Sequence, residues 1–185
     1  MIIYFVTGNK SKFLEAKSIA KPAGVELIQK DIELIESNSQ KQKEIVLEKA
    51  RQAYKKIKKP VIVDDTALYF HAYKNFPGTL TKDLIQRIGQ RGIKNLLNGL
   101  NKTAHFQTLV CYKDKKTWKI FSGTWKGKII EKSSREVNPD WSYNSIFIPE
   151  GFSIPLSELP LEERAKHSHR KKALLKLLRN LRKRK

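Results

Sequence analysis

The chain has 185 residues, with 38 Lys and Arg against 18 Asp and Glu, so its formal net charge is +20. This length fits one domain with a sizeable core, and a hydrophobic content of 39% excludes an intrinsically disordered chain. The single cysteine, Cys111, excludes an internal disulfide and a cysteine-based zinc cluster, and is typical of a reducing cytoplasm.

The positive charge is concentrated at one end of the sequence. Residues 164–185 contain 11 Lys and Arg and no acidic residue. Such a run is usually a solvated helix face or a frayed tail, although a basic surface also attracts polyphosphates and nucleic acids. At the other end, residues 1–6 are apolar but too short for a signal peptide or a membrane span, so we expect a soluble cytoplasmic protein.

The first strand and helix form a possible phosphate-binding unit. The β-branched and aromatic run Ile2–Val6 predicts a buried strand, and a helix follows from about Lys10 to a point before Pro22. Gly8 lets the backbone approach a ligand closely, and the amides at the helix start favour an anion. A plain Gly-Asn turn before an amphipathic helix is the alternative interpretation.

A central stretch carries the strongest chemical signal. After a strand at residues 25–29, an acidic loop at 31–38 and a helix at about 40–57, a buried strand at 61–63 runs into Asp64, Asp65 and Thr66. If the strand ends here, it delivers two carboxylates and a hydroxyl to one point, which suggests a divalent-metal or proton-transfer site. The simpler interpretation is a helix cap.

The second half of the chain predicts further strands and helices. Thr81 is expected to cap a helix that Gly89 ends, and a short helix follows at residues 92–97. A period of two over 104–111 predicts a strand buried mostly on one side, joined by a hairpin turn at 114–116 to a long strand at 118–130. Antiparallel pairing here and βα units earlier predict a mixed sheet.

The last third combines aromatic and basic side chains. Trp141 and Tyr143 precede a short strand and are either core residues or a stacking platform for a base. A short helix is expected to begin with Ser157 as its cap, and Ser168 is expected to cap the last helix, which has a leucine stripe. His169 and Arg170 lie in its first turn, where helix amides favour an anion. No linker or repeat divides the chain, so we expect a single domain over residues 1–185 with a basic helix at about 169–185.

Seven short motifs in order resemble those of the inosine triphosphate pyrophosphatase family. They span nearly the whole chain, and some details are similar to archaeal members. The motifs are Thr7-Gly-Asn-Lys-Ser-Lys12, Glu36 in its acidic loop, Val63-Asp-Asp-Thr-Ala-Leu68, Asn75-Phe-Pro-Gly78, Tyr143-Asn-Ser-Ile-Phe147, Ser157-Glu-Leu159 and Ser168-His-Arg170.

The resemblance implies an α/β fold with an elongated mixed sheet flanked by helices, and two lobes with a nucleotide cleft between them. It also implies a cytoplasmic homodimer and a Mg²⁺-dependent hydrolase. The implied reaction cleaves non-canonical purine nucleoside triphosphates (ITP, dITP, XTP) to the monophosphate and pyrophosphate, which cleanses the nucleotide pool.

The resemblance also assigns roles to individual residues. Asp65 is expected to accept the proton of the attacking water, with Lys12 as a second catalytic residue. Mg²⁺ is expected on Glu36 and Asp65, with Asp64 beside them. The expected substrate-binding residues are Thr7, Gly8, Asn9, Lys10, Ser11, Lys12, Lys49, Thr66, Trp141, Ser142, Tyr143, Asn144, Arg164, His169 and Arg170.

The base pocket departs from the family pattern. Asn144 stands where the family usually has a carboxylate, so an amide with NH₂ donors replaces a negative charge. Arg164 stands where the family has a lysine. The altered pocket leaves two alternatives open: a pyrophosphatase for modified pyrimidine nucleotides, and a catalytically weak nucleic-acid-binding protein that uses the basic C-terminal helix.

Overall fold

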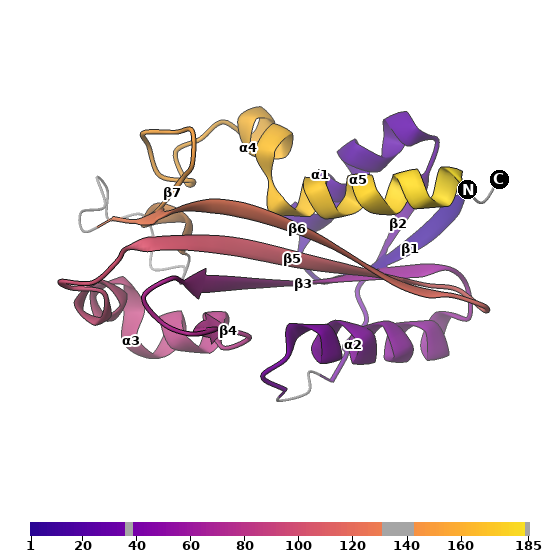
Figure 1. The fold of residues 1–185 in the computed structure, drawn as a ribbon. Helices are drawn as coiled ribbons and strands as arrows, with labels where there is room; N and C mark the ends of the chain where they lie inside the picture. Colours follow the sequence, from indigo (N-terminus) through magenta and orange to yellow (C-terminus); the bar gives the residue numbers. More distant parts are fainter. Residues whose placement is uncertain (36–38, 131–142, 184–185) are drawn as a thin grey trace. The chain divides into compact units, whose positions relative to one another are not determined.

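The computed structural model describes residues 1–35, 39–130 and 143–183. Its strands form one seven-stranded sheet with the order β2-β1-β3-β5-β6-β7, and β4 pairs with β3 off this path. β1 runs parallel to β2 and β3, whereas β4 is antiparallel to β3 and β7 to β6. The expected mixed sheet flanked by helices is confirmed (Figure 1).

The strands have these bounds: β1 Ile2–Val6, β2 Glu26–Lys30, β3 Val61–Phe70, β4 Pro77–Gly78, β5 Thr103–Lys113, β6 Trp118–Ile129 and β7 Phe147–Pro149. The helices are α1 Lys10–Ala20, α2 Gln42–Ile57, α3 Thr81–Leu96, α4 Leu161–His167 and α5 His169–Arg182, with short 3₁₀ turns at Lys21–Ala23 and Tyr143–Ser145. Within the described ranges, no helix is long and apolar enough to cross a membrane.

The chain folds into two compact units. Unit 1 contains residues 1–66, 108–124 and 168–185, and unit 2 contains residues 67–107 and 125–167. The nucleotide cleft expected between two lobes depends on how the two units are placed, so it stays a prediction. The expected single domain over residues 1–185 also stays a prediction.

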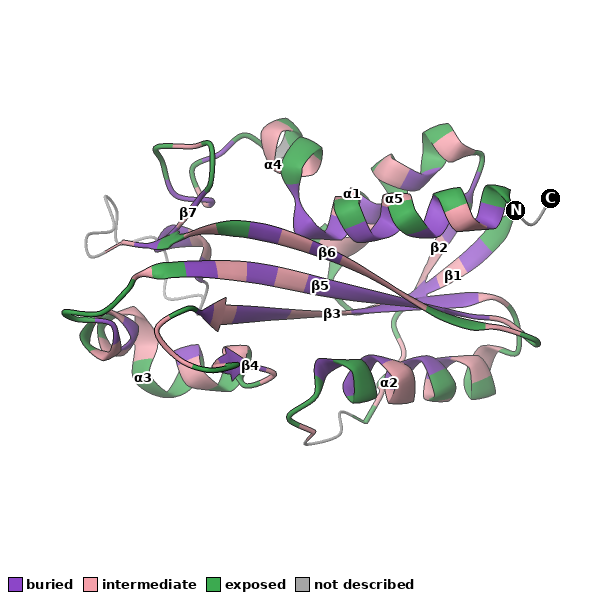
Figure 2. Cartoon of the chain, viewed as in Figure 1, coloured by how far each residue is buried: buried purple, intermediate pink, exposed green. Residues whose placement is uncertain are grey.

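Unit 1 has a sheet covered by helices on both faces (Figure 1). On one face, leucines of α5 and Ala16 of α1 pack against Ile3, Phe5 and Val110. On the other face, Val46, Ala50 and Ala53 of α2 pack against the alternate strand residues, such as Val63 and Cys111. Side chains point to opposite faces at successive strand positions, so two helical layers bury both sets. Figure 2 shows buried and exposed residues alternating along α2 and α5, as expected for helices that lie on a sheet.

This double cover corrects the expectation for β5. The alternation of buried and less buried residues holds from Ala104 to Gln107, but every residue from Thr108 to Lys113 is buried. The second half of the strand belongs to unit 1, where helices cover both faces. The strand is therefore not buried mostly on one side over its whole length.

Unit 2 has its own core around Leu68, Phe70, Ile93 and Phe147. Two sequence expectations in this unit were wrong in detail. Thr81 does not cap α3 but lies inside it, because its hydroxyl accepts a hydrogen bond from the Leu68 amide (2.8 Å) and donates one to a carbonyl oxygen. The short helix begins at Leu161, and Ser157 lies before it. By contrast, the helix break expected at Gly89 is confirmed, because Gly89 has non-helical backbone angles (φ 61°, ψ −175°) between two helical segments of α3.

Candidate active site

β3 does not end at the two aspartates, so the expected convergence of Asp64, Asp65 and Thr66 at one point was wrong. The strand continues to Phe70, and the three residues lie in its middle. Successive strand positions face opposite sides of a sheet, so Asp64 and Thr66 face α1 and α5 while Asp65 faces α2. The contacts below follow this division.

Asp64 is a buried carboxylate held by two cations. Its side chain is 2% exposed, with Oδ1 at 3.2 Å from Lys12 Nζ and Oδ2 at 2.9 Å from Arg170 Nε. Burial alone would raise the pKa of Asp64, but the charges of Lys12 and Arg170 outweigh it and hold this pKa at about 2. Asp64 is therefore ionised, and both of its oxygens are used by protein cations.

Arg170 connects three elements of unit 1. Besides Asp64, its guanidinium donates to Glu15 of α1 through Nη1 (2.5 Å) and to Thr66 of β3 through Nη2 (3.4 Å). Glu15 also accepts a hydrogen bond from Ser168, which caps α5 as expected by accepting from the Lys171 amide (2.9 Å). Sequence reasoning missed Glu15, although its position one turn after Lys12 on α1 places the two side chains on the same helix face.

Thr108, which the sequence motifs also did not indicate, makes a second set of polar contacts. Its hydroxyl lies 2.8 Å from the Thr66 hydroxyl and 2.6 Å from Nδ1 of His169. Burial lowers the pKa of His169 well below its usual range and Arg170 adds to this effect, so the imidazole is neutral near pH 7. The alternation of β5 did place Thr108 on the buried side, but its partners come from other strands and helices.

The opposite face of β3 carries the second carboxylate. Oδ1 of Asp65 accepts a hydrogen bond from Nζ of Lys49 at 3.0 Å, with side chains 16% and 11% exposed. Its carbonyl oxygen accepts from the Gln42 side chain (3.1 Å). Lys49 thus turns inward from α2, as the sequence hypothesis required. Each of the two aspartates is paired with lysine, one on each face of the same strand.

The turn before α1 is ordered by its own side chains. Oδ1 of Asn9 caps α1 by accepting from the Lys12 amide (3.0 Å), and the Thr7 hydroxyl accepts from the Asn9 amide (3.1 Å). Gly8, Asn9, Lys10 and Ser11 are all exposed. A Cβ at Gly8 would lie 2.8 Å from Asp31 Oδ1, so a side chain there would displace the end of that carboxylate.

The remaining candidates lie in unit 2 or outside the described residues. Tyr143 is buried and packs edge-on against Phe70, with ring centroids 6.2 Å apart. Arg164 donates to the carbonyl oxygens of Leu159 and Ser157, at 2.9 and 2.5 Å, and Asn144 is partly buried. Glu36, Trp141 and Ser142 lie outside the described residues. The proposed roles of these residues stay predictions.

No group of three or more His, Cys, Asp or Glu side chains suited to a metal ion occurs among the residues that the structure describes. Asp65 offers a hard oxygen donor of the kind that Mg²⁺ prefers, and its side chain is partly accessible. Asp64 fits less well, because a metal would have to displace Lys12 or Arg170.

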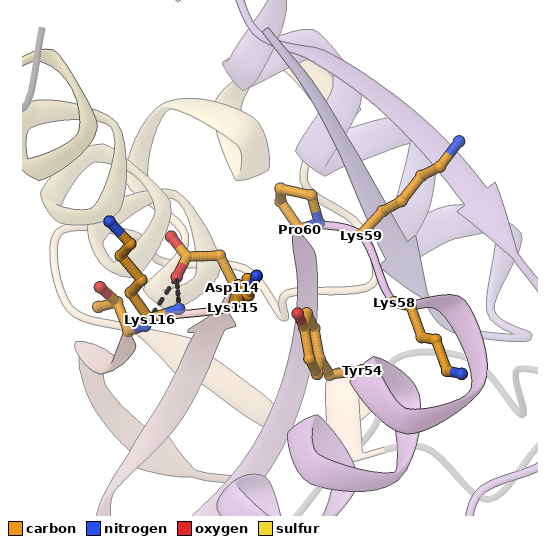
Figure 3. A pocket seen from close by; sticks show the side chains of 8 residues that line it. Tyr54, Lys58, Lys59, Pro60, Asp114, Lys115 and Lys116 are labelled. Carbon is orange, nitrogen blue, oxygen red and sulfur yellow. Dashed lines mark hydrogen bonds between the residues drawn. The ribbon is translucent and has the colours of Figure 1, made fainter.

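A basic hollow of about 410 Å³ lies elsewhere in unit 1 (Figure 3). Tyr54 and Pro60 line it together with Lys58 and Lys59 on one side and the turn at 114–117 on the other. Asp114 orders this turn by accepting from the amides of Lys116 (2.8 Å) and Thr117 (2.7 Å). None of the lining residues belongs to the predicted nucleotide site, so the hollow is a separate basic feature.

Comparison with solved structures defines the class of fold. A structure titled as a HAM1 protein from Coxiella burnetii aligns over 99% of both chains with a TM-score of 0.85 at 21% identity. The Staphylococcus aureus Ham1 protein aligns over the full length of both chains with a TM-score of 0.81 at 24% identity. The protein therefore has the mixed α/β fold of Ham1 structures.

Sequence comparison assigns the family. The model of the Ham1 family matches residues 3–180, and the chain belongs to that family. The chain is similar to a dITP/XTP pyrophosphatase of Saccharolobus solfataricus, with 39% identity covering 92% of this chain and 88% of that protein. It is also similar to an inosine triphosphate pyrophosphatase of Yarrowia lipolytica, with 33% identity over 96% and 94% of the two chains.

Proposed function

We propose that the protein hydrolyses non-canonical purine nucleoside triphosphates, such as dITP, ITP and XTP, to the monophosphate and pyrophosphate. The observation that carries the proposal is the pair of lysine–aspartate contacts, Lys12–Asp64 and Lys49–Asp65, on the two faces of β3. Relatives named dITP/XTP pyrophosphatase or inosine triphosphate pyrophosphatase, 31–39% identical over most of this chain, support the choice of substrate.

The basic side chains would bind the triphosphate. Lys12 lies in the first turn of α1, directly after the exposed, glycine-containing turn, and the amides of the first helical turn favour a phosphate group. Its side chain is 28% exposed, so the ammonium group that pairs with Asp64 would still reach a ligand. Lys49 would neutralise further phosphate charge from the opposite face. Thr7, Asn9 and Thr66 would complete the phosphate contacts.

Mg²⁺ would be held by Asp65 together with Glu36. When bound, the ion neutralises charge on the phosphates and makes a water easier to deprotonate. Asp65 would take the proton as water attacks the α-phosphorus and the α–β phosphoanhydride breaks. We infer that Asp64 would fix Lys12 and Arg170, because both of its oxygens accept hydrogen bonds from them.

The base would be recognised by His169, Arg170 and the altered aromatic segment. A neutral His169, whose Nδ1 lies 2.6 Å from the Thr108 hydroxyl, would contact the base with its ring held in place. Trp141 and Tyr143 would stack on the base, and Ser142, Asn144 and Arg164 would line the same pocket. Since Asn144 brings NH₂ donors, the pocket favours bases with an oxygen at the recognised edge.

Product analysis with a nucleotide panel tests the proposal. Purified protein and Mg²⁺ should release pyrophosphate from ITP, dITP and XTP, and little from ATP or GTP. Asp65→Asn should abolish release, whereas Asp83→Asn, at an exposed position on α3, should not change it. Release of single phosphates, or none from any triphosphate, would overturn the proposal. Preference for modified pyrimidine triphosphates would replace the substrate class, and salt-sensitive binding to RNA or DNA without hydrolysis would favour the nucleic-acid alternative.

The resemblance further supports a cytoplasmic homodimer. Light scattering coupled to size-exclusion chromatography checks the dimer directly, because a mass near 21.4 kDa would mean a monomer. Fractionation of the source cells checks the cytoplasmic location.

A further inference from the structure

Two histidines of unit 2 lie side by side outside the proposed nucleotide site. His71 directly follows β3 and His105 lies on the neighbouring strand β5. Nε2 of His71 lies 2.9 Å from Nδ1 of His105, and the ring centroids are 5.1 Å apart. At this distance the two nitrogens share a hydrogen bond, in which one nitrogen carries the proton and the other accepts it with its lone pair.

The spacing of the rings is also that of two ligands of one metal ion. Imidazole nitrogens bind Zn²⁺ at about 2.0–2.1 Å, so a tetrahedral angle puts the two nitrogens about 3.3 Å apart and the ring centroids about 5.2 Å apart. The observed centroid separation of 5.1 Å is close to this value, whereas the two nitrogens lie 2.9 Å apart in their hydrogen bond and would have to move apart by a few tenths of an ångström on binding an ion. Binding needs a small tilt of each ring and a tautomer change in His105, in which water carries the proton from Nδ1 to Nε2, so that both lone pairs turn toward a common ion.

Neighbouring groups hold the two rings for such a role. Nδ1 of His71 lies 2.8 Å from the Thr103 hydroxyl, so an Nδ1–H donor there leaves Nε2 as the ligand. Tyr69 stacks on His105 with ring centroids 5.1 Å apart and an interplanar angle of 18°. Burial, His71 and Lys126 lower the pKa of His105, which keeps its ring neutral and available near pH 7.

We propose that His71 and His105 form a binding site for a divalent transition-metal ion such as Zn²⁺. His71 binds through Nε2 and His105 through Nδ1, and water completes the coordination, since no third His, Cys, Asp or Glu joins them in the described ranges. Imidazole selects Zn²⁺, Ni²⁺ or Cu²⁺ over Mg²⁺, which prefers oxygen ligands. This site is therefore independent of the Mg²⁺ site of the proposed reaction.

Calorimetric titration of tag-free protein with Zn²⁺, in excess Mg²⁺ to occupy oxygen sites, tests the proposal. One ion per chain should bind, and both His71→Gln and His105→Gln should remove this binding. The matched control is His167→Gln, which changes another exposed histidine of unit 2 and should bind as the wild type does. Thr103→Val keeps both ligands and should weaken binding by about tenfold or more, as loss of an outer partner of a metal ligand does.

Nitrogen-15 NMR of the imidazoles supplies a readout that does not depend on activity. On adding Zn²⁺, the signals of Nε2 of His71 and Nδ1 of His105 should shift together, while those of His167 stay in place. Unchanged Zn²⁺ binding in the two glutamine variants, or binding that is lost equally in His167→Gln, would overturn the proposal. A folded His71→Gln variant with a wild-type melting temperature excludes loss of binding through unfolding.

Discussion

Replacing Asp64 by asparagine tests the proposed structural role of the buried carboxylate. The change keeps the shape of the side chain but leaves Lys12 and Arg170 without their shared anion. Breaking a buried ion pair by removing one partner costs about 3–5 kcal/mol of the free energy of unfolding. Lys12 is 28% exposed and can turn to water, and Arg170 keeps Glu15, so we expect the lower end, about 3 kcal/mol, at pH 7.

The pKa of Asp64 gives an independent estimate and a pH window. A decrease from 3.8 to about 2 corresponds to about 2 kcal/mol of stabilisation at neutral pH. Because the pKa is lower in the folded than in the unfolded state, this stabilisation is complete above the unfolded value near 4 and is lost as the pH falls toward 2. The difference in stability between wild type and Asp64→Asn should therefore shrink below pH 4.

Native-state hydrogen exchange of the amides of β1 and of the first part of β3, up to Thr66, at several pH values between 2.5 and 7 is the suitable assay, because these residues belong to unit 1. Glu44→Gln is the matched control, because it removes a carboxylate from the exposed pair with Lys41 and should leave the stability almost unchanged. A difference between wild type and Asp64→Asn below about 1 kcal/mol at pH 7, or one that stays constant down to pH 2.5, refutes the reasoning.

Three further predictions follow from contacts in unit 1. Lys49→Met should lower kcat/KM for ITP roughly 30-fold, or about 2 kcal/mol, because it removes a charged hydrogen bond to Asp65, while Lys55→Met on the exposed side of α2 should not; equal kinetics in both variants would contradict the assigned role. Leu177→Ala should cost about 3 kcal/mol in urea unfolding, since this side chain is 2% exposed in the core under α5; a loss below 1 kcal/mol would mean that the site collapses without a cavity. Gly123→Ala should lower both activity and melting temperature, because the added Cβ would lie 2.7 Å from the Ala173 amide and push the first turns of α5 away; normal activity at a lowered melting temperature would contradict the link between α5 and the site.

Local sequence patterns were sufficient for most of the elements. β1 has the predicted bounds, and α1 ends before Pro22 because proline cannot continue the ladder of hydrogen bonds. The leucine stripe and the Ser168 cap of α5 were confirmed, since both depend on residues only a few positions apart. Periodicity and capping are short-range signals, so they are visible in a single sequence.

The end of β3 could not be predicted in this way. Two adjacent aspartates are poor strand residues, and nothing nearby in the sequence indicates that they are neutralised. The partner that makes Asp64 tolerable inside the sheet is Arg170, at a separation of 106 residues. The Thr81 cap failed for a similar reason, because the Leu68 amide competes for its hydroxyl from a strand that precedes α3.

In the candidate site, too, residues in local motifs could be predicted, whereas residues that act through long-range contacts could not. Resemblance supplied Lys12, Asp64, Lys49 and Arg170, and the structure brings these side chains into ion pairs. The resemblance did not supply Glu15, which accepts a hydrogen bond from Arg170, or Thr108, whose hydroxyl is hydrogen-bonded to His169. Such supporting residues carry no motif of their own, because their role follows from which elements pack together.

The three separated stretches of unit 1 have a consequence for the synthesis of the protein. Residues 1–66 leave the ribosome early, yet the helix that covers Ile3 and Phe5 and supplies Arg170 is α5, which ends at Arg182. At about 5–20 residues per second, the intervening stretch of about 115 residues takes roughly 6–25 s to make. Throughout that interval the nascent strands β1 and β3 expose an apolar face, and Asp64 lacks its partner Arg170. A chain released before Leu181 lacks part of this cover, so partial products should be substrates for chaperones and proteases.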